Sequence, residues 1–117
     1  MRSKKPPCNS GCPVEAALEA IGGKWKGLIL YHLKDDTRRF NALKRELPGI
    51  TQRMLTKQLR ELEDEQIVDR KVYAQVPPKV EYSLSEFGQT LVPVINELQV
   101  WGYAYLGRKN TNNRNAS

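Results

Sequence analysis

The chain has 117 residues, of which 19 are Lys or Arg and 13 are Asp or Glu, giving a formal net charge of +6. This length predicts one domain with a modest core. No stretch approaches the roughly 20 apolar residues of a membrane-spanning helix, and the N-terminus lacks the apolar segment of a signal peptide, so we expect a cytoplasmic protein without a membrane partner. In that compartment the two cysteines are expected to be thiols.

The positive charge lies mainly at the two ends of the chain. Residues 1–12 and 107–117 each contribute +3, so bases and acids balance in the body between them. We expect a mobile N-terminal arm at residues 1–11, one domain at residues 12–106 and a disordered C-terminal tail at residues 107–117. Basic tails bind many polyanions weakly, so the arrangement of charge within the domain is the more informative signal.

Two helices are predicted at the start of the domain. Pro13 follows a capping position at Cys12 and is favoured as a first helical residue, and Gly22-Gly23 would end that helix. A second helix, from about Lys24 to Leu33, is expected to direct four residues inward: Trp25, Leu28, Ile29 and Leu33.

Residues 41–67 have the pattern of a helix-turn-helix. Asn41 can cap a short helix from Ala42 to Leu47, and Pro48-Gly49 then forms a turn so short that the next helix must be a steeply angled neighbour. Thr51 is a good cap for that second helix, in which leucines at i, i+4 and i+7 form one apolar stripe: Leu55, Leu59 and Leu62. In helix-turn-helix proteins the second helix is the recognition helix, which lies in the DNA major groove.

The opposite face of this recognition helix carries side chains of the types that bind phosphates and base edges: Gln52, Arg53, Thr56, Lys57 and Arg60. A charged outer face is commonly no more than a solvated surface. Here, however, residues 38–60 hold seven Lys or Arg and one Glu, whereas residues 61–69 hold five acids and no base. A solvated surface has no reason to segregate its charges in this way, so we favour DNA binding.

A β-hairpin is predicted after the recognition helix. Apolar and polar residues alternate from Val68 to Val72 and from Val80 to Leu84, as in half-buried strands. The segment between them contains two adjacent prolines and must be a loop. Such a hairpin is a wing, whose polar side chains are suited to phosphate or minor-groove contact: Arg70, Lys71, Gln75 and Lys79. Thr37 to Phe40 could add an edge strand.

A long final helix is predicted from Ser85-Glu86 to about Leu106, with a local kink at Pro93. Its apolar residues cover more than one stripe, which a small domain does not need unless a second chain covers part of them. We interpret the first and last helices as the interface of a homodimer, and the alternative is a helix covered by its own core. The predicted interface residues are Val14, Leu18, Leu91, Ile95, Leu98, Trp101 and Tyr105.

Together these elements predict a mainly helical α+β fold, a winged helix-turn-helix with added N- and C-terminal dimerisation helices. The predicted partner is double-stranded DNA. The predicted DNA contacts are Arg38, Arg39, Lys44, Thr51, Gln52, Arg53, Thr56, Lys57, Arg60, Gln75 and Lys79.

Three segments in this order, CPVEAALEAIGGKWKGLIL, RRFNALKRELPGITQRMLTKQLRELE and VEYSLSEFG, resemble the HxlR family of bacterial winged-helix regulators, relatives of the MarR group. The similarity extends from about Cys12 to Leu106. It implies a transcription regulator whose two recognition helices enter successive major grooves of a pseudo-palindromic operator, with half-sites about 34–36 Å apart. It also implies that the first and last helices form the homodimer interface.

The resemblance gives particular weight to Cys12, because several family members sense quinones, aldehydes or oxidants through a cysteine directly before this helix start. The local chemistry agrees, since a helix N-terminus near Lys4 and Lys5 favours the reactive thiolate. A small electrophile or oxidant would then be a further partner. Cys8 could be a resolving thiol or a bystander, and Cys12 could itself be an inert buried residue.

Other classes of function are disfavoured. Cys8 and Cys12 are accompanied by no second pair of cysteines, and His32 is the single histidine, so we expect neither a metal nor a cofactor. No Gly-rich phosphate loop, Ser/His/Asp set or paired carboxylates indicate an enzyme. The alternative from another class is a winged-helix adaptor whose basic face binds acidic protein without sequence-specific DNA binding.

Overall fold

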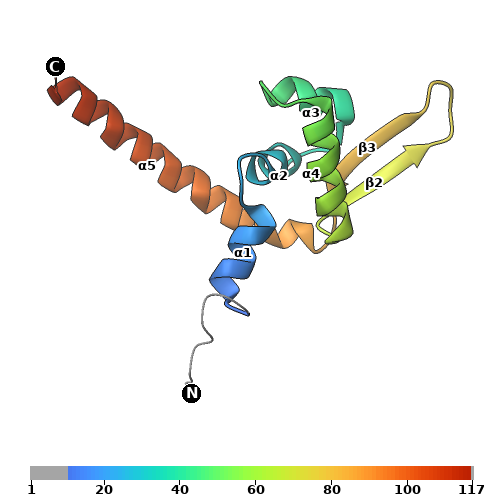
Figure 1. The fold of residues 1–117 in the computed structure, drawn as a ribbon, viewed down its shortest axis with the longest axis horizontal. Coiled ribbons are helices and arrows are strands. Elements are labelled where there is room, and N and C mark those ends of the chain that lie inside the picture. The colour runs from blue at the N-terminus through green and yellow to red at the C-terminus, as the bar shows by residue number, and fades with distance from the viewer. Residues whose placement is uncertain (1–10, 117) are drawn as a thin grey trace.

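The structure, a computed structural model, describes the backbone of residues 11–116 and the side chains of residues 11–110 (Figure 1). Residues 1–10, almost all of the predicted mobile arm, lie outside the described part. In chain order the elements are helices α1 (Pro13–Ile21) and α2 (Lys26–Leu33), strand β1 (Arg38–Arg39), helices α3 (Phe40–Glu46) and α4 (Gln52–Asp64), strands β2 (Val68–Tyr73) and β3 (Lys79–Leu84), the 3-10 helix η1 (Gly88–Leu91) and helix α5 (Val92–Ala116).

The three strands form one antiparallel sheet in the order β1-β3-β2. Strands β2 and β3 pair along their whole length, from Val68 opposite Leu84 to Tyr73 opposite Lys79. They form the hairpin that extends from the body of the molecule in Figure 1. Strand β1 pairs with the other side of β3. The fold is therefore the mainly helical winged helix-turn-helix that the sequence predicts, and both the wing and the short edge strand are confirmed.

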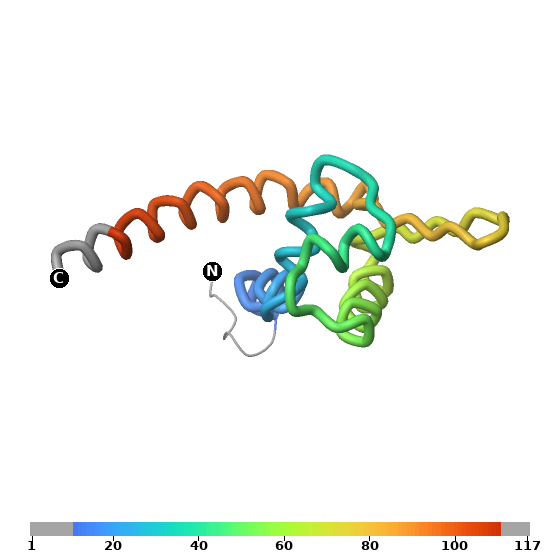
Figure 2. Tube along the Cα trace, turned by 90° about the horizontal axis from the view of Figure 1, so that it is seen from above, coloured from blue at the N-terminus to red at the C-terminus, as the bar shows by residue number. Residues whose placement is uncertain are grey.

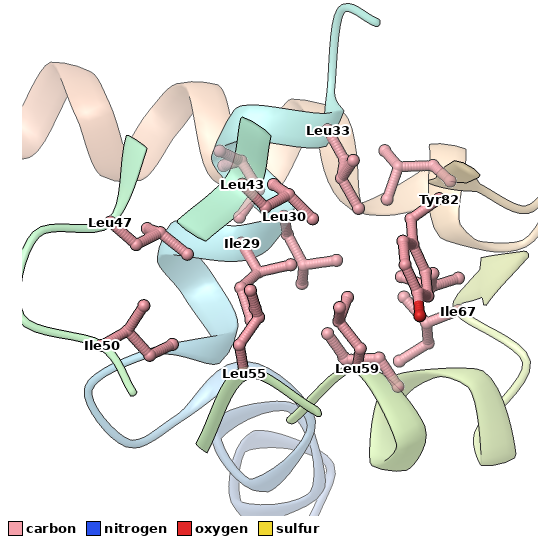
Figure 3. Close-up of a cluster of buried hydrophobic side chains, with 14 residues drawn as sticks. Ile29, Leu30, Leu33, Leu43, Leu47, Ile50, Leu55, Leu59, Ile67 and Tyr82 are labelled. Atoms are coloured by element: carbon pink, nitrogen blue, oxygen red, sulfur yellow. The ribbon is translucent and has the colours of Figure 1, made fainter. Parts of the chain in front are cut away.

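The core lies where α2, α3 and α4 meet the sheet (Figure 3). The leucine stripe of α4, made of Leu55, Leu59 and Leu62, is at most 1% exposed, as predicted. The same core contains buried side chains from other helices, strands and connecting segments, including Ile29, Leu30, Leu33, Leu43, Leu47, Ile50, Ile67, Val68 and Tyr82. Each fully buried leucine contributes about 1.5–3 kcal/mol relative to an exposed one. The core therefore fixes which face of α4 points outward.

Both ends of α4 are set by specific hydrogen bonds. The hydroxyl of Thr51 accepts a hydrogen bond from the backbone N–H of Met54 at 3.0 Å, which confirms the predicted cap. At the other end Gln66 has a φ of 62°, and the N–H of Ile67 donates to the carbonyl of Leu62 at 3.0 Å. That left-handed residue and that hydrogen bond form a Schellman motif, which ends the helix and turns the chain into β2.

Helices α2 and α3 differ from the prediction in two details. Leu28 is 44% exposed, whereas Leu30, which was not expected to point inward, is buried. Because the α2 sequence is apolar on several sides, its periodicity does not determine which face is buried. Helix α3 begins at Phe40 instead of Ala42, since Arg39, the last residue of β1, already has the extended backbone of a cap residue. Asn41 consequently lies inside the helix and is not its cap.

The C-terminal segment differs more. A 3-10 helix, η1, precedes α5, so Pro93 lies in the first turn of α5, where its missing N–H has no partner to lose. Helix α5 then continues through Ala116, past the expected end at Leu106 and into the segment for which disorder was predicted. No proline follows Pro93 to break the helix. Gly107 lowers the stability of a helix by only about 1 kcal/mol relative to alanine, so the helix can continue past it. The helix projects from the body on the side opposite the wing (Figure 2).

Candidate nucleic-acid interface

The outer face of α4 gathers five of the predicted contact residues. Their side chains line one shallow hollow, together with two acids nearer the end of the helix, and the seven are Gln52, Arg53, Thr56, Lys57, Arg60, Glu61 and Asp64. The leucine stripe on the other side of α4 is buried, so these polar groups necessarily face solvent. The arrangement offers cations, an amide and a hydroxyl along one helix, which are the groups that bind phosphates and base edges.

The acidic end of this face is tied to α2. Lys26 Nζ lies 2.9 Å from Glu61 Oε1. The hydrogen bond and charge of Lys26 lower the pKa of Glu61, burial raises it by less, and the charge of Lys57 lowers it further. Glu61 is therefore ionised at neutral pH, because its pKa lies below the ordinary value. Its charge, with that of Asp64, would repel a polyanion from the last turn of α4 and leave the cationic residues before that turn to approach it.

A second hollow joins α4 to the wing. It is lined by Thr56, Arg60, Glu63, Arg70 and Tyr82. Arg70 on β2 therefore lies beside the outer face of α4, although it is separated from Arg60 by the acidic segment in the sequence. A polyanion in contact with α4 can be reached by this wing arginine as well.

A third hollow lies between the start of α3 and the wing loop, and three cations from separate elements line it: Arg39, Arg45 and Lys79. Arg39 and Lys79 were predicted as phosphate contacts, and their position at one hollow agrees with a shared partner. Arg45 was not singled out. Arg45 follows Lys44 directly in the sequence, so the sequence alone does not show which of the two cations faces the hollow. The orientation of α3 shows that Arg45 does. Gln75, in the wing loop, is exposed.

Two other predicted contacts have structural bonds of their own. Arg38 Nε lies 3.1 Å from Glu46 Oε1, and Arg38 Nη1 lies 3.2 Å from Asp36 Oδ2. Arg38 thereby links β1 to α3, and two carboxylates compensate its charge. His32 Nδ1 lies 3.7 Å from the same Glu46 oxygen. Thr51 uses its hydroxyl for the cap of α4, whereas Lys44 is exposed.

An apolar surface runs along α1 and α5. Among the predicted interface residues, Val14, Leu18, Leu98 and Trp101 are more than half exposed, and Tyr105, which stacks on Trp101 with ring centroids 5.2 Å apart, is 47% exposed. Ile95 is different. It is 4% exposed and belongs to the chain's own core, with the half-buried Leu91 packed beside it. The prediction of Ile95 as a surface for a second chain is therefore wrong, because the start of α5 packs on α2.

The cysteine in the described part of the chain lies at the start of α1 and lines none of the three hollows. Cys12 occupies the cap position of α1, its side chain makes no capping hydrogen bond, and it is 6% exposed. That burial limits access of a reagent to the thiol in this conformation. Cys8 lies outside the described residues.

Within the part of the chain that the structure describes, no three or more His, Cys, Asp or Glu side chains gather where they could hold a metal ion. Over the same residues no helix has the length and apolar character needed to cross a membrane.

Comparison with known proteins decides the family. A family model described as an HxlR-like helix-turn-helix matches residues 20–110. The chain belongs to this family. The HTH-type transcriptional regulator YdeP of Bacillus subtilis (strain 168) is 61% identical over 98 residues, which are 84% of this chain and 77% of YdeP. The resemblance inferred from the sequence is thus confirmed, and relatives of the chain are helix-turn-helix transcription regulators.

Solved structures of the redox regulator HypR are also similar to this HxlR-family chain. The reduced form has a TM-score of 0.81 and 56% identity, and the match covers 85% of this chain and 98% of HypR. The oxidised form has a TM-score of 0.77 and 60% identity, with coverage of 80% and 96%. The winged helix-turn-helix fold is common to all three.

The lowered pKa values of Glu61 and Glu81 predict acid-sensitive stability. The pKa of Glu81 is lowered chiefly by the hydrogen bond from Tyr73, and further by Lys79 and Arg39. Because each folded-state pKa lies below the ordinary value of 4.5, the stabilisation is present above about that pH and is lost as the pH falls through the folded values. Urea unfolding between pH 6 and 3 should show this loss, and Glu61→Gln with Glu81→Gln should flatten it.

Thr51→Ala is the control for this experiment. It removes an uncharged cap and should lower the free energy of unfolding by about 0.5–2 kcal/mol at every pH. A double glutamine variant with the wild-type pH dependence would show that the two carboxylates do not stabilise the fold through these partners.

Proposed function

We propose that the protein is a homodimeric, sequence-specific DNA-binding transcription regulator. The observation that carries the proposal is the division of α4 into a buried leucine stripe and an outer face with Arg53, Lys57 and Arg60 at one hollow. A helix of this kind fits the width of a B-DNA major groove, in which arginine and glutamine side chains can read base edges. The relatives named as HTH-type transcriptional regulators support the same conclusion.

In the proposed complex the contacts divide into two kinds. Arg53 and Gln52, in the first turn of α4, contact base edges, with Thr56 and Lys57 one turn further on. Arg39, Lys44, Lys79 and, newly, Arg45 contact phosphates beside the groove, and Arg60 with Arg70 does so between α4 and the wing. Phosphate contacts hold the protein in register without reading sequence, whereas base contacts discriminate between sequences.

This division predicts that an arginine variant and a lysine variant lose DNA affinity in different ways. Arg53→Ala should weaken binding to the duplex preferred by the wild type by about 1–3 kcal/mol and relax discrimination at one position of each half-site. Lys79→Ala should weaken binding to preferred and random duplexes by the same factor. Fluorescence anisotropy titrations with both duplexes, at a fixed salt concentration, measure both effects. Equal losses on both duplexes for Arg53→Ala would refute the assignment.

The homodimer is supported by the exposed apolar side chains on α1 and α5. In a lone chain they face water, and an apolar surface of this kind is typical of an interface. Two copies joined through these helices would present two α4 helices to successive major grooves, about 34–36 Å apart.

A charge within this surface should break the dimer. Leu98→Glu places a carboxylate in the proposed interface, where an unpaired buried charge costs about 3–5 kcal/mol. Sedimentation equilibrium should therefore find a dimer for the wild type and a monomer for Leu98→Glu at micromolar concentration. Val76→Glu, at a wing residue that is 98% exposed, is the control and should remain a dimer. A monomeric wild type would contradict the proposal.

A second part of the proposal is a thiol switch at Cys12. The position of Cys12 at the start of α1, beside the proposed dimer interface, favours it, as does the similarity to a redox regulator. Modification of the thiol would displace α1 and change the angle between the two α4 helices. Because Cys12 is buried, the start of α1 must open before a small electrophile or oxidant can react with it.

The test compares DNA binding before and after diamide treatment. Wild-type affinity for the preferred duplex should change about fivefold or more, as in ordinary allosteric coupling, and Cys12→Ser should not respond. Cys8→Ser distinguishes a resolving thiol, which is needed for the response, from a bystander, which is not. An unchanged wild-type affinity would reject the switch while leaving the DNA-binding proposal intact.

A further inference from the structure

One face of the wing carries a cluster of charged and aromatic side chains that the proposed DNA contacts do not fully explain. Glu81 lies in the central strand, opposite Arg39 of β1 on one side and Lys71 of β2 on the other. Tyr73 and Lys79 are paired two positions nearer the wing loop. Directly opposed residues share a face, and so do residues two apart along a strand. These five residues, here called the wing cluster, therefore place one anion among three cations.

The carboxylate of Glu81 is bonded through both of its oxygens. Tyr73 Oη donates a hydrogen bond to Oε1 at 2.9 Å, and Lys79 Nζ lies 3.2 Å from Oε2. Lys79 Nζ also lies 4.6 Å from the centroid of the Tyr73 ring, so the ammonium group has a carboxylate and an aromatic ring as partners. The side chains of Lys79 and Glu81 are 24% and 23% exposed. Partial shielding from water strengthens this pair relative to one on an open surface.

The cluster adjoins the hollow between α3 and the wing loop, because Arg39 and Lys79 belong to both. A phosphate in that hollow would meet an ammonium group whose charge Glu81 already compensates. It would also be repelled by the carboxylate itself. In the described part of the wing, Glu81 is thus the group that opposes phosphate binding at the site where Lys79 favours it.

We propose that Glu81 limits the sequence-independent DNA affinity of the protein by competing with the phosphate backbone for Lys79, which it binds within the wing cluster. This inference rests on the proposed DNA-binding function and adds a residue that restrains it. Sequence-independent binding is dominated by contacts to phosphates. A regulator that bound random DNA too tightly would be held by the very large number of competing genomic sites. Glu81 would reduce that competition without contacting a base.

The test is the variant Glu81→Gln, which keeps the size of the side chain and an oxygen that accepts from Tyr73 but removes the negative charge. Affinity for a random duplex should rise about threefold, and the dependence of binding on salt should steepen by up to about 0.9, the value for one full phosphate contact. Affinity for the preferred duplex should rise by the same factor. Thermal unfolding of each variant establishes that it is folded.

Two further variants identify the cause. Glu86→Gln makes the same change in net charge at an exposed residue beyond the base of the wing, and it should leave both affinity and salt dependence unchanged. In a Lys79→Ala background, Glu81→Gln should have no effect, because the lysine that it frees is absent.

The inference would be overturned by an unchanged random-duplex affinity in Glu81→Gln, by an equal gain in Glu86→Gln, or by a gain that persists without Lys79. The measurement needs no sequence preference. A wild type that binds all duplexes alike would refute the proposed regulator, and the response to Glu81→Gln would still decide the role of Glu81.

Discussion

The burial of one leucine stripe determines most of what this molecule can bind. Leu55, Leu59 and Leu62 lie in the core against α2, α3 and the sheet, so α4 cannot turn about its axis without exposing them. The Thr51 cap and the Schellman motif at Gln66 fix where the helix begins and ends. The position, rotation and ends of α4 are then determined, and so are the directions of its outer side chains. Burial of the leucines on one face of α4 therefore places its cations on the opposite face, toward solvent.

Electrostatics on the rest of the surface moderates that cationic face. Arg38 is paired with Glu46, Lys26 with Glu61, and Lys79 with Glu81. The first two pairs join separate elements, whereas the third lies within β3. All three reduce the positive charge presented to a polyanion. Arg53, Lys57 and Arg60 project from the one face where the core dictates their direction. This contrast is why we assign sequence reading to α4 and weaker, sequence-independent contact to the wing.

Short-range patterns in the sequence predicted the elements well. The leucine spacing, the Thr51 cap and the two prolines of the wing loop act within a few residues, and helix-turn-helix, wing and edge strand all appear where they were expected. Features that depend on packing were harder to predict. Because α2 is apolar on several sides, its sequence does not show that Leu30 is buried and Leu28 exposed. Because α5 is also broadly apolar, its sequence does not show that Ile95 belongs to the chain's own core. Arg45 and the wing cluster depend on how separate elements meet.

Sequence-specific DNA binding can be tested by selecting bound sequences from a random pool of DNA duplexes, in parallel with reduced and with diamide-treated protein. We expect enrichment of one inverted repeat whose half-sites lie one helical turn apart, because two α4 helices of a dimer can reach successive major grooves at that spacing. Loss or change of that enrichment after oxidation is expected from the thiol switch. Binding without any enrichment in either sample would contradict the central claim and favour a winged-helix adaptor for acidic protein.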